Sequence, residues 1–109
     1  MQGMSLPDDE IIPDPAAPRP RIVALRQTCV NCPASWEGRT DDDRPIYIRY
    51  RHDALSVRLG PVGGDFYSAV DAWPWFESEE LDHFDPWTIP IEKVCALTGV
   101  VVDCVVQVD

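Results

Sequence analysis

Residues 33 to 60 alternate between apolar and polar side chains so regularly that they constrain the fold more than any other stretch. Such alternation predicts half-buried strands, and two sets of turn residues divide the stretch into a three-stranded antiparallel meander. The expected apolar face consists of Trp36, Ile46, Ile48, Tyr50, Leu55, Val57 and Leu59. The expected polar face consists of Glu37, Tyr47, Arg49, Arg51 and Arg58. We therefore expect the first face to cover the core and the second to face solvent.

The second hairpin of the meander has a register that follows from its turn. A two-residue turn at His52 and Asp53 places Tyr50 opposite Leu55 and brings the apolar side chains of both strands together. For the first hairpin, a loop over residues 41 to 45 would place Trp36 opposite Tyr50.

The same loop would place Glu37 opposite Arg49. A slip by one residue would move Trp36 to the charged face, because side chains alternate with a period of two. We therefore expect this register.

The segments around the meander complete the expected fold. Residues 1 to 20 are rich in proline and acids and predict a flexible arm. Residues 21 to 28 predict a strand with Ile22 and Ala24 inward. After the meander, Asp65 is suited to cap a short helical or irregular segment, and the residues from there to 90 have no clear conformation.

The last part of the chain predicts one helix and one strand. Pro90 and Gly99 bound a helix over residues 91 to 98, with Ile91, Val94, Cys95 and Leu97 largely buried. Residues 100 to 108 predict a final strand with Asp103 and Gln107 on its exposed side. Residues 21 to 109 are therefore expected to form a single α+β domain, a small antiparallel sheet of the meander and flanking strands packed on one short helix.

The charge of the chain is negative and unevenly distributed. Its 109 residues carry a formal charge of −10, and residues 61 to 109 hold ten acids but only one base, Lys93. This balance disfavours direct binding to nucleic acid and favours a basic protein as partner. The start lacks a secretory leader, and no apolar run is long enough to span a membrane, so we expect a cytoplasmic protein that binds no membrane.

The cysteines allow two interpretations. Cys29 and Cys32 have the spacing of half a zinc site, for which Cys95 and Cys104 are the candidates that would complete it. The apolar neighbours of that second pair instead favour free thiols, so plain cysteines without a cofactor are the favoured interpretation. A redox role lacks its usual βαβ context.

Catalytic motifs are not found in the sequence. It contains no nucleophile elbow, no phosphate-binding glycine loop and no HExxH, and His83 among acids is better explained as solvated surface. We therefore expect a protein that is not an enzyme and has no small-molecule substrate.

Two surfaces are candidates for partner binding. The polar face of the meander, with Tyr47, Arg49, Arg51 and Arg58, suits carboxylates or phosphates, unless the acidic segment folds over it and neutralises it. The second surface is the aromatic and acidic segment with Trp73, Trp75, Phe76, Glu77, Glu79, Glu80, Asp82, Asp85 and Trp87. It suits an interface to a basic protein, and covering the core is the equally weighted alternative.

The motif CPASWEGRTDDDRPIYIRYR resembles a group of short, largely uncharacterised bacterial and phage proteins that share the pattern CPxxWEGxTxDxRxxYIRYR. The resemblance covers residues 32 to 65 and implies a small accessory protein of a phage or mobile element, with no activity or catalytic residues to transfer. Together with the acidic second half, it predicts an inhibitor or adaptor that occupies a basic nucleic-acid-binding surface, as anti-CRISPR and anti-restriction proteins do. The alternative is a zinc-stabilised structural or nucleic-acid-associated module that uses the CxxC pair and the arginine face.

Overall fold

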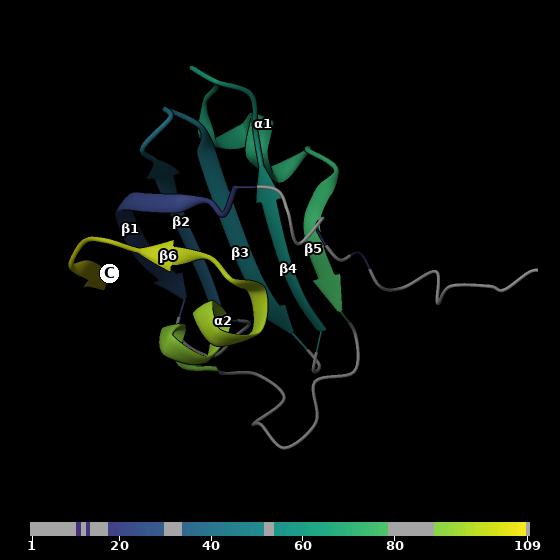
Figure 1. Cartoon of the computed structure of the whole chain (residues 1–109), viewed down its shortest axis with the longest axis vertical. Coiled ribbons are helices and arrows are strands. Elements are labelled where there is room, and N and C mark those ends of the chain that lie inside the picture. The colour runs from purple at the N-terminus through teal and green to yellow at the C-terminus, as the bar shows by residue number, and fades with distance from the viewer. Residues whose placement is uncertain are drawn as a thin grey trace, which may run out of the picture.

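The computed structural model of the protein describes residues 11, 13, 18–29, 34–51, 54–78 and 89–108. Seven strands form one curved sheet, and two helices lie against it (Figure 1). In chain order the elements are β1 (Arg21–Cys29), β2 (Ala34–Thr40), β3 (Pro45–Arg51), β4 (Ala54–Leu59), α1 (Phe66–Val70), β5 (Pro74–Ser78), α2 (Ile91–Thr98), β6 (Val101–Val102) and β7 (Val106–Val108).

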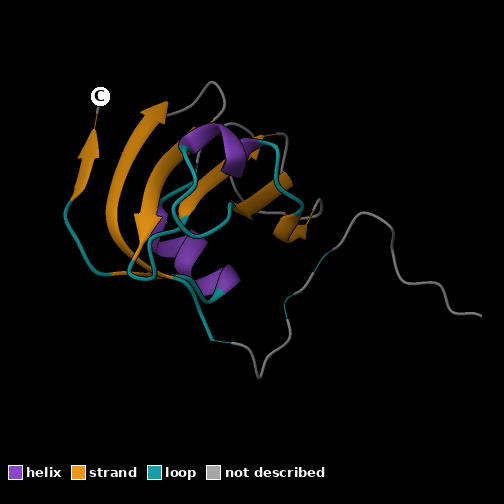
Figure 2. Cartoon of the chain, turned by 90° about the horizontal axis from the view of Figure 1, so that it is seen from above, coloured by secondary structure: helices purple, strands orange, loops and turns teal. Residues whose placement is uncertain are grey.

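The sheet is mixed, with the strand order β5-β4-β3-β2-β1-β6, and β7 also pairs with β1. Strands β1 to β5 pair antiparallel, whereas β6 and β7 run parallel to β1. The expectation of a small antiparallel sheet on one short helix is therefore wrong. The chain crosses over through α2 before it returns beside β1, which makes the last pairings parallel, and α1 lies on the face opposite α2 (Figure 2).

The meander confirms the expected partition into two faces. All the residues expected on the apolar face are buried, and the most exposed of them, Leu59, is only 9% exposed. They form one cluster with Ile22, Phe76, Ile89 and Val94, so α2 and the segment before it cover this inner face. No helix among the described residues is long and apolar enough to cross a membrane.

The two hairpins of the meander differ in how well their registers match expectation. Between β3 and β4, Tyr50 pairs with Leu55, as the two-residue turn predicts. Between β2 and β3, Trp36 pairs with Ile48 instead of Tyr50, a shift of two residues. An even shift preserves the face of every side chain, so Trp36 remains buried.

The shifted register results from a tighter turn than the one expected. Asp43 adopts a left-handed conformation with φ of 65°. Its amide donates to the Thr40 carbonyl at 3.0 Å, and the Thr40 amide donates to the Arg44 carbonyl at 2.9 Å. Only three residues then lie outside the ladder, which is the pattern of a type I turn followed by a left-handed residue. Aspartate tolerates that conformation, so Pro45 joins the strand instead of the loop.

A bulge in β1 changes which of its side chains point inward. The pairing with β2 shifts between Ile22 and Ala24. Ile22 is buried as expected, but Ala24 is exposed and Leu25 is buried in its place. An extra residue reverses the alternation beyond it.

The bulge also divides the C-terminal strand. The expected single strand over residues 100 to 108 is two strands, because the step from Ile22 to Leu25 in β1 faces a longer step from Val102 to Val106. The interruption holds Asp103, whose amide donates to the Ile22 carbonyl at 2.9 Å and whose side chain is exposed as expected.

Helix α2 has the expected bounds, from Pro90 before its first turn to Gly99 with φ of 84° after its last. Val94 is buried and Ile91 and Cys95 are partly buried, but Leu97 is 37% exposed, contrary to expectation. The stripe that faces the sheet runs through Val94 to Thr98, and Leu97 lies at its margin.

Strand β5 occupies a segment that the sequence left unassigned. It pairs with β4, and Val57 lies opposite Phe76. On its other edge, Ile11 and Glu77 form a single antiparallel bridge, with N···O distances of 2.7 and 2.9 Å. The remainder of the arm expected over residues 1 to 20 lies outside the described residues, apart from Pro13 and residues 18–20.

Candidate functional site

The outer face of the sheet carries a row of polar residues from four strands. Ser35 on β2 pairs with Arg49 on β3, Arg49 pairs with Ser56 on β4, and Ser56 pairs with Glu77 on β5. Because directly paired residues point to the same face, these four side chains lie side by side across the sheet. The row places a cation and an anion on one surface with a serine between them.

A second row lies beside the first. Tyr47 pairs with Glu37 on one side and with Arg58 on the other. Glu37 was expected opposite Arg49, but in the observed register it accepts an ion-pair hydrogen bond from Arg26 of β1. The Glu37 carboxylate, which was expected to neutralise Arg49, therefore forms an ion pair with Arg26 instead.

The members of the two rows that lie on β3, β4 and β5 form the floor of a cleft of about 570 Å³. Its polar lining consists of Tyr47, Arg49, Ser56, Arg58, Asp71 and Glu77. Arg58 is fixed in orientation, because its Nη1 donates to the Ala72 carbonyl at 2.5 Å. Among the described residues neither Arg49 nor Arg58 forms an ion pair, so the charges that line the cleft remain available.

Helix α1 forms one side of this cleft. Its first residue, Phe66, packs edge to face on Tyr47, with ring centroids 5.5 Å apart and planes at 85°. Asp65 caps the helix as expected, because its carboxylate accepts from the Ser68 amide at 3.0 Å. On the other side of Phe66, a smaller hollow of about 320 Å³ lies over β1, β2 and β3.

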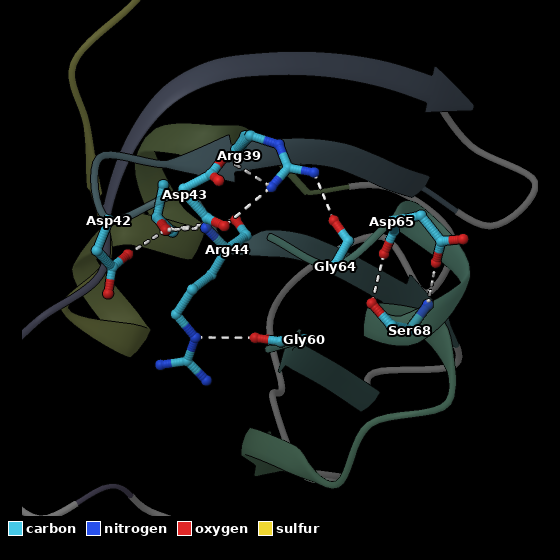
Figure 3. A network of polar contacts seen from close by, with 9 residues as sticks. Arg39, Asp42, Asp43, Arg44, Gly60, Gly64, Asp65 and Ser68 are labelled. Carbon is cyan, nitrogen blue, oxygen red and sulfur yellow. Dashed lines mark hydrogen bonds and ion pairs between the residues drawn. The ribbon is translucent and has the colours of Figure 1, made fainter. Parts of the chain in front are cut away.

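A network of hydrogen bonds fixes the loop that leads into α1 (Figure 3). The Arg39 guanidinium donates to the Asp43 carboxylate at 3.1 Å and to the Gly64 carbonyl at 2.5 Å. The Arg44 side chain donates to the Gly60 carbonyl at 2.8 Å. Two arginines of the first hairpin thus hold both ends of the loop, so α1 is presented at a defined position on the sheet.

The aromatic and acidic segment divides between core and surface. Phe76 is 5% exposed, and Trp75 packs against the core with the Arg19 guanidinium 5.9 Å from its ring centre. Trp73, in contrast, is 82% exposed, and Glu77 lines the cleft. Of the described tryptophans, Trp75 thus helps to cover the core, whereas Trp73 is exposed to solvent and its role in an interface stays a prediction.

The other residues predicted in this segment lie outside the described residues. They are Glu79, Glu80, Asp82, Asp85 and Trp87. The side chain of Arg51 and residue His83 lie outside them as well. The structure therefore places only the beginning of the acidic segment beside the arginine face, through Asp71 and Glu77.

Sequence reasoning missed two exposed apolar side chains in the residues that precede Trp73 along the chain. Tyr67 on α1 is 73% exposed and Val62 in the preceding turn is 68% exposed. The shortness of the segment that forms α1 could have indicated this exposure, because a helix of five residues can bury only one narrow face. That face holds Ala69, the one buried residue of α1, and Tyr67 points away from it.

Three of the four cysteines, Cys29, Cys95 and Cys104, lie among the described residues, and each is a partly buried free thiol. Cys29 lies partly buried at the end of β1, and Cys32 is outside the described residues. Burial, together with the charge of Glu92, raises the pKa of the Cys95 thiol above its ordinary value. No three His, Cys, Asp or Glu side chains in the described part of the chain gather closely enough to hold a metal ion.

Comparison of the chain with protein-family models, with curated proteins and with solved structures finds no match. The resemblance of the CPxxWEG motif to short bacterial and phage proteins therefore remains a prediction. What the protein does must be argued from the charges and exposed side chains of its own surface.

Proposed function

We propose that this protein is a non-enzymatic adaptor or inhibitor that binds a basic surface of another protein through α1 and the turns around it. We call this region the α1 surface and define it by Val62, Tyr67, Asp71 and Trp73. The observation that carries the proposal is the 82% exposure of Trp73 next to an exposed carboxylate, Asp71.

Exposed indole and phenol rings favour burial against a partner. A tryptophan or tyrosine offers a large, rigid contact area, and such residues contribute most of the binding energy in many interfaces. Tyr67 and Trp73 are both more than 70% exposed and lie within one short segment of the chain. They are therefore the expected anchors of the interface.

The charge of the surrounding chain favours a basic partner. Residues 61 to 109 carry ten acids and one base. Such an excess accelerates association with a positively charged surface and makes it sensitive to salt. Proteins that handle nucleic acids have such surfaces, so they are the partner class we propose, as in the anti-defence role suggested by the phage-like motif.

The α1 surface is also positioned before binding occurs. The hydrogen bonds from Arg39 and Arg44 hold the loop that precedes α1, and Asp65 caps the helix. A surface that is already ordered loses little conformational entropy on binding. This favours recognition by a preformed surface.

Co-purification from lysate at low and high salt tests the proposal. We expect a basic protein to be retained at low salt and released at high salt. We expect the double variant Tyr67→Ala, Trp73→Ala to lose it, because each hot-spot aromatic contributes about 2 kcal/mol or more. Changing Glu77, Glu79, Glu80 and Asp82 to lysine should weaken retention further through charge alone.

The matched control is Val105→Ala, which removes an equally exposed apolar side chain, 82% exposed, from the loop between β6 and β7. Undiminished retention by the Tyr67 and Trp73 double variant would refute the α1 surface as the interface. Retention of the partner that does not change with salt concentration would refute the proposed contribution of negative charge to binding.

A further inference from the structure

The cleft over β3, β4 and β5 is lined by charges of both signs. Arg49 and Arg58 come from β3 and β4, whereas Glu77 comes from β5 and Asp71 follows α1. We propose that this cleft binds a small zwitterion, a free amino acid or a short peptide, with its carboxylate at Arg49 and its ammonium group at Glu77. The sequence predicts no small-molecule substrate, and the zwitterion proposed here is a ligand that is bound and not converted.

The spacing of the charges supports a ligand that bridges them. Arg49 and Glu77 lie in one row with Ser56 between them. Adjacent strands are about 4.8 Å apart, so the two backbone positions are separated by roughly 10 Å. The two side chains do not form an ion pair with each other. A zwitterion can bridge this gap, because its carboxylate can bind Arg49 while its ammonium group binds Glu77.

The balance of charges disfavours simpler ligands. Two guanidinium groups and two carboxylates line the same cleft, so a plain anion is attracted by one side and repelled by the other. The same holds for a plain cation. Only a ligand with separated charges of both signs meets a favourable partner at each end.

Each end of the cleft has suitable chemistry for its part of the ligand. A guanidinium binds a carboxylate through two parallel hydrogen bonds, and no described side chain forms an ion pair with that of Arg49. The Ser56 hydroxyl lies midway and can donate or accept. Val70 and Ala54 are partly exposed and add apolar surface for a side chain of the ligand.

The size of the cleft agrees with this ligand class. Its volume of about 570 Å³ lies within the range of small-molecule sites, about 300 to 1,000 Å³. The cleft shares Asp71 with the α1 surface, but the two proposed anchors of the protein interface, Tyr67 and Trp73, do not line it, so the two proposals can fail separately.

Nuclear magnetic resonance of the isotope-labelled protein tests the proposal directly. The probes are the free protein amino acids, one at a time, and glycylglycine. A ligand should produce saturable shifts of the Arg49 side-chain Nε–H and of the backbone amides of Ser56 and Glu77. N-acetylated and amidated forms of the best probe, each lacking one charge, should bind at least about tenfold more weakly, the loss expected for one charge-assisted hydrogen bond.

Variants test the two ends separately. Arg49→Gln and Glu77→Gln should each weaken binding by about tenfold or more. Arg26→Gln, which removes a guanidinium from the same face but outside the cleft, should leave binding unchanged. Equal binding of the acetylated and free forms would show a site for oxyanions only and overturn the proposal. Absence of saturable shifts with every probe would overturn it as well.

Discussion

Replacing Gly38 with alanine should destabilise the fold through a backbone collision. A Cβ atom at Gly38 would lie 2.1 Å from the carbonyl oxygen of Ala24, where β1 bulges toward β2. Because the opposing atom belongs to the backbone and not to a flexible side chain, only separation of the two strands relieves the contact. The substitution therefore tests whether the bulge in β1 requires a residue without a Cβ atom at position 38.

The size of the effect follows from the movement required. The strands must separate by about 1 Å locally, which weakens one or two ladder hydrogen bonds at about 1 kcal/mol each. Steric strain in a packed region adds about 1 to 3 kcal/mol. The total of about 3 kcal/mol should lower the midpoint of thermal unfolding by about 15 °C in a domain of this size.

Urea and thermal unfolding followed by circular dichroism measure this loss. Gly63→Ala is the matched control, because Gly63 has a φ of 77° but no atom within 4 Å of the position of a new Cβ. Its cost should be only the conformational one, about 1 kcal/mol. A cost for Gly38→Ala no larger than that of Gly63→Ala would refute the argument from close strand approach.

Three further changes probe single interactions. Asp65→Ala should lower the free energy of unfolding by about 1 kcal/mol, because it removes the cap on the Ser68 amide, and Asp65→Asn should retain most of it in the same urea assay. Thr98→Val should cost about 1 kcal/mol by removing the buried hydroxyl that donates to the Val94 carbonyl at 2.7 Å, and an unchanged urea midpoint would contradict this. Cys95 should react with iodoacetamide at neutral pH more slowly than free cysteine, since its raised pKa lowers the thiolate fraction; peptide mapping by mass spectrometry at increasing pH should show its labelling accelerate, and labelling as fast as free cysteine would argue against burial.

The features that follow from side-chain alternation could be predicted from the sequence. The inner face of the meander, the β3–β4 register and the bounds of α2 all follow from periodicity and turn residues. These patterns are local, so each is decided by residues that are close in sequence. The predicted register of β2 against β3 was wrong by two residues, because the observed register depends on Asp43 adopting a left-handed conformation. Other residues of the loop could have adopted this conformation, so the sequence did not single out Asp43.

The remaining errors come from interactions between distant segments. The bulge in β1 turns Ala24 outward and divides the C-terminal strand, yet it exists because β1 pairs with strands on both sides. Strand β5 was missed because Trp75 and Phe76 are adjacent and both apolar, which conceals the alternation that follows from Phe76. Such pairings are set by tertiary contacts and have no local signature.

The candidate site shows the same division. The sequence placed Tyr47, Arg49 and Arg58 on one face, and the structure brings them together over a cleft. It named Glu77 and allowed the acidic segment to fold over this face, but it could not place Asp71 and Glu77 at the cleft, because they reach it only through α1 and β5. The exposure of Tyr67 likewise depends on how a five-residue helix is oriented on the sheet.

The bridge between Ile11 and Glu77 determines how the sheet ends. An exposed edge strand invites pairing with other chains, and here the protein places its own arm against β5. The ladder cannot continue through Pro13, the next residue that would hydrogen-bond, because proline has no amide hydrogen. Among the described residues, Ile11 is the one that bridges the arm to β5, through two backbone hydrogen bonds with Glu77. At this position the edge of the sheet is therefore occupied by a segment of the same chain, which blocks pairing with another chain there.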